Sequence, residues 1–193
     1  MRHTLIIVVA VLLASCSPDA EPAETTLADT TTTTRAEITT TTVAPPFGVS
    51  SPAFAEGAGI PTVHTCDGSD MSPELNVVGI PEGTNSIVVI VDDLDAPLGT
   101  WDHWVEYDIP TTGGSLVIPG GADQAGVPGI NSWNLEGYKG PCPPPGEQHT
   151  YHFRLYAIQG KLGLPHGVDS ATVREAMEGV VLDEVELTGT YAR

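Results

Sequence analysis

Basic residues are scarce in this chain of 193 residues. It has 7 lysines and arginines against 25 aspartates and glutamates, which gives a formal net charge of −18 at pH 7. Nucleic acids and anionic lipid surfaces repel a chain of this charge on average, although a local pocket can differ from the average. Nucleic acid is therefore not an expected partner.

The motifs of several enzyme classes are also absent. The sequence has no G-x-S-x-G elbow and no glycine-rich phosphate or dinucleotide fingerprint. Without H-x-x-x-H or C-x-x-C pairs, zinc ligands would have to come from loops more than forty residues apart. We predict no metal, no cofactor and no catalysis. The weaker alternatives are a metal site and an enzyme that uses Asp93 and His149 as acid and base.

The N-terminus is typical of an exported protein. Arg2 precedes an apolar run over residues 4–14, which is too short to span a bilayer comfortably. The sequence LASC at residues 13–16 resembles the lipobox of bacterial lipoproteins and predicts a signal peptide over 1–15 and acylation, as with palmitate, of Cys16. An ordinary signal peptide with a chance cysteine is the alternative. The expected location is the extracytoplasmic face of the cell membrane.

The rest of the chain divides into two parts. Residues 17–46 consist mainly of threonine, alanine, proline and acidic residues, which cannot bury enough surface to form a core, so we predict that the lipidated Cys16 is followed by a disordered tether to residue 46. Residues 47–193 form one domain of ordinary size. Short β-type runs at 75–81, 86–93, 102–110, 151–158 and 185–192 predict a mostly β sandwich or barrel.

Two further patterns refine this prediction. In the run over 151–158, Tyr151, Phe153, Leu155 and Ala157 alternate onto one face of a strand. A single helix is expected over 170–180, with Asp169 or Ser170 as its N-cap.

Two polar clusters are candidates for a site. The run VDDLDAPLGTWDHW over residues 91–104 ends a buried strand in carboxylates and leads to His103. The run GYKGPCPPPGEQHTY over residues 137–151 is stiffened by prolines, which fix φ, and delivers His149 and Tyr151 to one side of a strand. Asp95 has a plain structural alternative, which is to fix the turn at Pro97.

Four ordered motifs together resemble the phosphatidylethanolamine-binding protein family, in particular its bacterial branch. They are TCDGSDMSPELNV, the runs that contain Asp93 and His149, and AMEGVVLDEVELTGTY. The resemblance implies a sandwich of two antiparallel sheets, with one or two short helices late in the chain and a small anion-binding pocket at the surface. The residues that it implies for ligand binding are Asp93, His103, His149 and Tyr151, with Asp95 and Pro97 shaping one loop and Gly140, Pro141 and Pro143 forming a wall.

The chain departs from the family pattern at a few positions. Leu94 stands where proline is usual, and Thr150 replaces a basic residue near the pocket. Val180 and Trp133 also differ from the usual residues, and we expect both to lie away from the pocket. Cys66 and Cys142 occupy family positions, from which we predict a disulfide outside the cytoplasm; two buried, unpaired thiols are the alternative.

The resemblance implies a binding function. We expect a tethered protein that holds a small anionic ligand or phospholipid head group, without catalysis. The alternative is a protein-interaction role, because the family includes kinase and protease inhibitors. The identity of the ligand and the formation of a homodimer, as in some bacterial relatives, are left open.

Overall fold

The structure is a computed structural model that describes residues 44–121 and 125–193. The predicted signal peptide, Cys16 and residues 17–43 of the predicted tether lie outside the described residues. Within the two described ranges, no helix has the length and the apolar character needed to cross a membrane. The structure therefore bears on the part of the chain predicted to form the domain.

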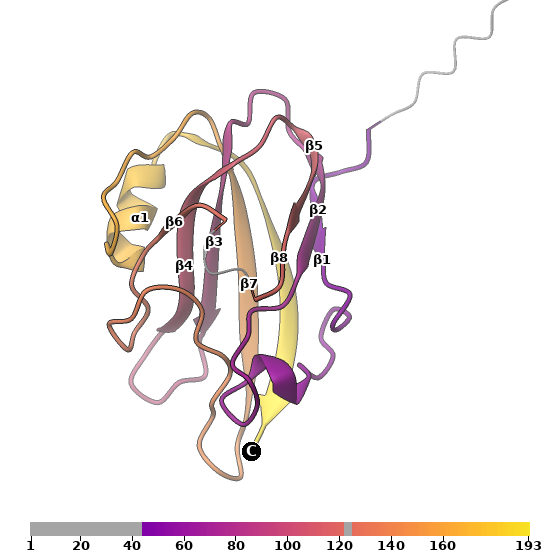
Figure 1. The fold of residues 1–193 in the computed structure, drawn as a ribbon, viewed down its shortest axis with the longest axis vertical. Helices are drawn as coiled ribbons and strands as arrows, with labels where there is room; N and C mark the ends of the chain where they lie inside the picture. The colour runs from indigo at the N-terminus through magenta and orange to yellow at the C-terminus, as the bar shows by residue number, and fades with distance from the viewer. Residues whose placement is uncertain (1–43, 122–124) are drawn as a thin grey trace, which may run out of the picture. The chain divides into compact units, whose positions relative to one another are not determined.

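Five strands form the larger of two antiparallel sheets, in the order β6–β4–β3–β7–β8 (Figure 1). Their bounds are Ser86–Asp93 for β3, Trp101–Pro110 for β4, Val127–Pro128 for β6, Gln148–Ile158 for β7 and Val181–Ala192 for β8. Every residue of the central strand β3 is buried. This explains why residues 87–91 of the strand are an unbroken apolar run and do not alternate with polar residues.

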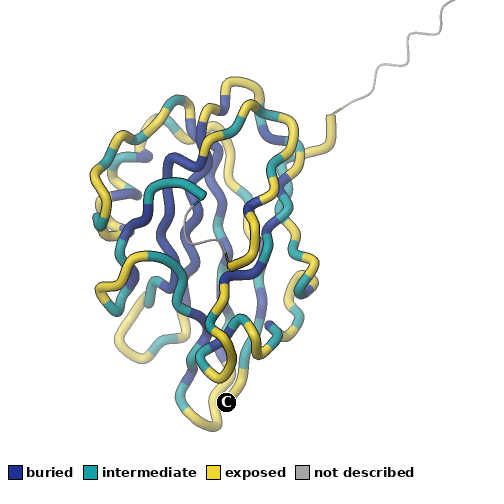
Figure 2. Tube along the Cα trace, in the orientation of Figure 1, coloured by how far each residue is buried: buried dark blue, intermediate teal, exposed yellow. Residues whose placement is uncertain are grey.

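Three strands form the smaller antiparallel sheet, in the order β1–β2–β5. They are β1 at Gly48–Ser50, β2 at Leu75–Ile80 and β5 at Gly114–Ile118. Side chains from both sheets meet in one buried cluster, which includes Val77 of β2 and Phe153 of β7. The predicted two-sheet sandwich is confirmed, and Figure 2 shows that most exposed residues lie in the connections between strands.

Strand β7 follows the predicted alternation. Tyr151, Phe153, Leu155 and Ala157 all belong to the cluster between the sheets. Each of these side chains is fully buried. A single strand therefore supplies a large share of the core, and the same alternation sends His152 to the opposite face.

One α-helix, α1 at Ser170–Met177, covers the outer face of the large sheet (Figure 1). Asp169 is its N-cap and accepts a hydrogen bond from the Thr172 N–H at 2.8 Å. The helix ends three residues earlier than predicted, because Gly179 adopts a positive φ of 77° that stops it after Met177. The described residues contain no second α-helix, only the 3-10 turn η1 at Thr62–His64.

Three short strands were not predicted: β1, β5 and β6. None has more than five residues, and the pattern of β5 is mostly exposed. Each pairs with a strand that is distant in sequence, as when Val77 of β2 lies opposite Leu116 of β5. Such strands are defined by their partners, so local sequence carries little signal for them.

The strands of the large sheet bring three distant segments together at one end. Asp93, the last residue of β3, lies opposite Trp101 on β4 and Tyr151 on β7. The loop from residue 94 to 100 and the proline-rich loop before β7 therefore meet at this end of the sheet. These two segments contain the polar clusters that the sequence analysis identified as candidates for a site.

Candidate ligand-binding site

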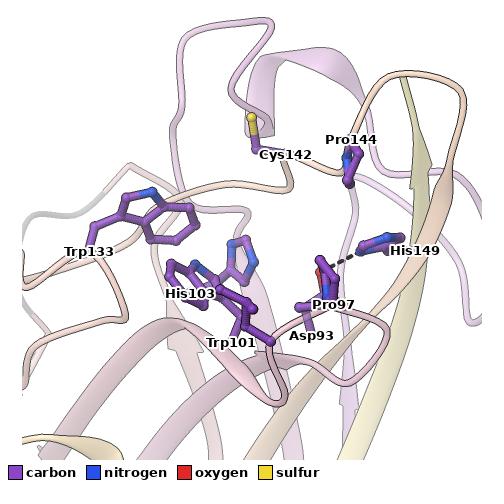
Figure 3. A pocket seen from close by; sticks show the side chains of 10 residues that line it. Asp93, Pro97, Trp101, His103, Trp133, Cys142, Pro144 and His149 are labelled. Atoms are coloured by element: carbon purple, nitrogen blue, oxygen red, sulfur yellow. Dashed lines mark hydrogen bonds and ion pairs between the residues drawn. The ribbon is translucent and has the colours of Figure 1, made fainter.

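A cavity of about 250 Å³ opens at this end of the sheet (Figure 3). Its walls are mostly apolar, and its ionisable side chains are one carboxylate and two imidazoles. No lysine or arginine is among its lining residues, which are Asp93, Ala96, Pro97, Leu98, Trp101, His103, Trp133, Cys142, Pro144 and His149. The cavity has room for a small polar group only, because pockets for whole drug-sized ligands measure roughly 300–1,000 Å³.

His149 is held between two carboxylates. Its Nδ1 lies 2.7 Å from Asp93 Oδ2, and its Nε2 lies 3.2 Å from Glu147 Oε2. Burial lowers the pKa of His149, but these hydrogen bonds outweigh burial, and the net pKa lies above the ordinary 6.5. With a carboxylate at each ring nitrogen, the surroundings of His149 favour its charged form, in which both nitrogens donate.

Asp93 organises the loop that follows it. Its Oδ1 accepts a hydrogen bond from the Asp95 N–H at 2.9 Å, which closes a tight turn directly after β3. Asp95 in turn accepts from the Thr150 N–H at 2.8 Å and so ties the loop to β7. Asp95 does not line the cavity, whereas Pro97 and Leu98 of the same loop do.

His103 is buried on β4 and lines the cavity. Its Nδ1 lies 2.6 Å from the carbonyl oxygen of Lys139. Burial lowers the pKa of His103, and the hydrogen bonds to the backbone of Lys139 and Gly140 only partly oppose this effect. The ring packs edge-on against Trp133 at 5.0 Å and against Tyr151 at 5.1 Å between centroids.

Tyr151 lies behind His103 and is not among the cavity's lining residues. It is fully buried, and its hydroxyl has no hydrogen-bond partner among the described residues. Burial, assisted by the charge of Asp93, raises the pKa of Tyr151 well above its ordinary value of 10. The phenol therefore keeps its proton at neutral pH, and its ring packs against the His103 ring.

The proline-rich loop is fastened to the loop around η1. Cys142 forms the predicted disulfide with Cys66, and their Cα atoms lie 5.5 Å apart. Asp70 accepts a hydrogen bond from the Gly140 N–H at 2.6 Å. A Cβ on Gly140 would lie 2.3 Å from the carbonyl oxygen of His64, so only glycine permits this close approach.

In the proline-rich loop, the residues that line the cavity are sequence neighbours of the residues that were predicted to line it. Cys142 and Pro144 line the cavity. Gly140, Pro141 and Pro143 are buried and are not among the lining residues. The alternate residues of an extended segment face opposite ways, so Cys142 and Pro144 face the cavity whereas Pro141 and Pro143 face away from it.

Sequence reasoning missed several lining residues. Trp133 was expected to lie away from the pocket, and this expectation was wrong: it lines the cavity and packs against Trp101 with centroids 5.3 Å apart. Glu147, the second partner of His149, was not considered. Its spacing of two residues from His149 at the start of a strand was the available signal, since such residues share a face.

The described part of the chain holds no group of three or more histidine, cysteine or acidic side chains arranged to bind a metal ion. The lining residues include no serine or threonine, and the only sulfur is engaged in the disulfide. The arrangement offers an acid and base pair, a fixed imidazole and two indoles. These groups can bind and orient a ligand.

Residues 50–192 match the sequence profile of the phosphatidylethanolamine-binding proteins. The chain belongs to the phosphatidylethanolamine-binding protein family. Relatives with the name UPF0098 protein include one from Aquifex aeolicus, 43% identical over 75% of this chain and 88% of the relative. Another, from Methanothermobacter thermautotrophicus, is 44% identical over 73% of this chain and 95% of the relative. These names state no enzymatic activity.

Two crystal structures share the fold. The phosphatidylethanolamine-binding protein homologue CT736 of Chlamydia trachomatis has a TM-score of 0.71 and 35% identity, covering 77% of this chain and 98% of that one. Escherichia coli YbcL has a TM-score of 0.70 and 32% identity, covering 77% of this chain and 99% of its own. The predicted family and fold are both confirmed.

Proposed function

We propose that this family member is a membrane-anchored, extracytoplasmic binding protein that holds a small ligand by an anionic, phosphate-like group and performs no chemistry on it. The observation that carries the proposal is the position of His149, which has a carboxylate at each ring nitrogen and a raised pKa, at a cavity whose lining includes no lysine or arginine. The anchoring part rests on the lipobox-like residues 13–16.

The size and lining of the cavity support a small head group. About 250 Å³ accommodates a phosphate-like group but not acyl chains. The indoles of Trp101 and Trp133 give apolar walls, which strengthen a hydrogen bond between an imidazolium and an oxyanion because they exclude water. The cavity lining offers no unpaired nucleophile, which favours binding over catalysis.

NMR titration of the purified protein with phosphate, phosphoethanolamine and acetate tests the proposal. We expect the ring protons of His103 and His149 to shift and saturate, and Asp93→Ala to abolish the shifts because it removes the partner that keeps His149 charged. Asp183→Ala is the matched control, since it removes an exposed carboxylate at the start of β8. Rings that stay still at millimolar ligand would contradict an anion site.

A protein-interaction role is the second candidate. Its support is the apolar rim of the cavity: Leu98 lines the cavity and is 88% exposed, and Leu94 of the same loop is about half exposed. Exposed apolar groups that gather beside a cavity are typical of interaction surfaces. If the ring protons of His103 and His149 do not shift with any small anion in the titration, this rim becomes the better candidate for the functional surface.

A further inference from the structure

Strand β8 forms one edge of the large sheet (Figure 1), and another segment of the chain already pairs with half of this edge. The Gly57 N–H donates to the carbonyl oxygen of Thr188 at 2.9 Å, and the Thr190 N–H donates to that of Ala58 at 2.9 Å. A parallel bridge joins Gly59 to Thr190. The second half of the edge therefore holds an added segment.

The first half of the same edge, at residues 181–186, is open. Among the residues that the structure describes, no segment pairs with it on the side away from β7. Residues 181–184 are all exposed, and Glu186 is exposed as well. An open edge of this kind is a ready template for the backbone of another strand.

The backbone groups of Glu184 and Glu186 face this open side. Along a strand, the N–H and C=O groups point by turns toward one neighbour and toward the other. Thr188 points its N–H outward to the Glu56 carboxylate at 2.9 Å, and the pairing with β7 has no shift between Thr188 and Glu184. The N–H groups of Glu186 and Glu184 are therefore outward too. The latter bonds only locally, to the side chain of Asp183 at 2.9 Å.

The side chains along this open half line a second cavity, on the outer face of the large sheet. Its volume is about 250 Å³, and its lining residues are Arg154, Tyr156, Glu184, Val185 and Glu186. The charge of Arg154 is already balanced, by Asp92 at 3.4 Å and Glu186 at 3.2 Å. Glu184 forms no ion pair within the described residues. The cavity therefore presents an unpaired carboxylate.

These charges decide which strand the edge accepts. If two copies of the chain paired through this segment, Glu184 and Glu186 of one copy would lie against the same residues of the other. Like charges directly opposite each other destabilise a strand pair, and each chain carries a net charge of −18. Charged side chains protect natural edges from self-pairing in this way. A basic segment meets attraction where a copy meets repulsion.

We propose that residues 181–186 of β8 bind an extended, basic segment of a partner protein, which adds to the large sheet as a further strand. Its basic residues stand at alternate positions opposite Glu184 and Glu186, because directly opposite side chains share a face about 5 Å apart. The residue between them lies beside Val185 and is apolar. A long basic side chain opposite Glu184 reaches the cavity beside Tyr156.

This surface is separate from the anion cavity, and the inference does not depend on the proposed function. The anion cavity lies where β7 begins, at His149. The open half of β8 pairs instead with the end of β7, where Arg154 lies opposite Glu186 and Tyr156 lies opposite Glu184. Strand addition of this kind takes its affinity from backbone hydrogen bonds and its specificity from alternate side chains.

Three synthetic peptides test the proposal against the purified full chain at physiological ionic strength. The first alternates lysine and valine. The second has the same sequence with N-methylated lysines, which blocks the strand hydrogen bonds and keeps every side chain and charge. The third has glutamate in place of lysine. We expect the first peptide to bind, the second to bind roughly tenfold or more weakly, and the third not to bind, as measured by fluorescence anisotropy.

A pair of variants and hydrogen exchange locate the binding. Glu184→Gln should weaken the first peptide by about fivefold, because it removes the unpaired carboxylate. Glu136→Gln is the matched control and should leave the affinity unchanged, since Glu136 is exposed and follows β6, at the opposite edge of the sheet. The first peptide should also slow hydrogen exchange at the amides of Glu184 and Glu186.

Three results would overturn the proposal. Equal affinity for the N-methylated peptide would mean that the charge of the chain alone attracts it. Protection of the Glu184 and Glu186 amides that rises with protein concentration, without peptide, would assign the edge to a second copy. A peptide that shifts the ring protons of His103 and His149 and leaves these amides unprotected would bind at the anion cavity instead.

Discussion

Asp92 and Asp93 are consecutive residues at the end of β3 and are equally buried, yet they lie on opposite faces of the sheet and have different partners. Asp93 faces the cavity and pairs with an imidazole. Asp92 faces outward, toward α1, and pairs with two guanidinium groups, Arg174 at 2.9 Å and Arg154 at 3.4 Å. Guanidinium groups stay charged at every pH that a protein experiences, whereas an imidazole titrates near neutrality.

The outer group, which we call the outer cluster, comprises Asp92, His152, Arg154, Arg174 and Glu186. Glu186 joins it through Arg154 at 3.2 Å and His152 at 3.1 Å. The cluster links the helix to four residues on three strands of the sheet and contributes to the structure. The comparison teaches that burial of a carboxylate does not by itself mark a site. The titratable partner and the adjacent cavity distinguish Asp93.

Replacement of both Cys66 and Cys142 by serine should have the largest effect. The two cysteines are 76 residues apart, and a cross-link of this span stabilises a protein by about 4 kcal/mol through the entropy of the unfolded chain. Ligand affinity should fall as well, because Cys142 lies in the cavity wall. Urea unfolding and the NMR titration measure the two effects. Unchanged affinity in the folded double variant would show that hydrogen bonds alone fix the wall.

Arg174→Met should weaken the outer cluster by about 1.5 kcal/mol at pH 7, after allowance for the partial exposure of Arg174. Burial already raises the pKa of Asp92 above 3.8 despite both arginines. A raised carboxyl pKa means that stability falls as pH rises from about 3.8 through the folded value. The variant should therefore lose little stability at pH 4 and more at pH 7.

Urea unfolding at pH 4 and pH 7 measures this difference. Lys161→Met is the matched control, because it removes an exposed positive charge that forms no ion pair within the described residues. Both variants should bind the anion probes like the wild-type protein. A loss of binding in Arg174→Met would mean that the two faces of β3 are coupled.

The sequence patterns predicted the strands that carry Asp92 and Asp93 but not the residues that these two carboxylates contact. The uninterrupted apolar run of β3 and the alternation in β7 predict strands, because burial on one or both faces imposes these patterns. The convergence of Asp93, His103 and His149 on one cavity came from the family resemblance. It depends on the register between three strands that are distant in sequence, which local patterns do not encode.

The positions of Trp133 and Arg174 also depend on contacts between residues that are distant in sequence. Trp133 lies in a loop and reaches the cavity only through packing against Trp101 and His103. Arg174 is on α1, and nothing in the helix pattern indicates that it meets Asp92 across 82 positions. Such contacts appear only once the sandwich is assembled, so sequence patterns predict strands more easily than partners.

Asp93→Asn should have the smallest effect on stability and the clearest effect on pH dependence. In the wild-type protein the raised pKa of His149 contributes stability below pH 6.5, which is lost as pH rises through the folded value. Asparagine can still accept from Nδ1 but carries no charge, so the pKa of His149 should fall. We expect the cost at pH 5.5 to exceed the cost at pH 8.5 by about 1 kcal/mol. The cost that remains at pH 8.5 arises because asparagine has one acceptor oxygen, whereas both oxygens of Asp93 accept hydrogen bonds.

Urea unfolding at these two pH values, with NMR titration of the His149 ring protons, checks the prediction. Asp95→Asn is the control: Asp95 bonds to the Thr150 N–H and is the weakest of the groups that raise the pKa of His149. The stability that depends on Asp92 would then change with pH in acid, whereas the stability that depends on Asp93 would be present below pH 6.5 and lost as the pH rises above it. If Asp93→Asn instead leaves the pKa of His149 unchanged, Glu147 is the carboxylate that keeps His149 charged.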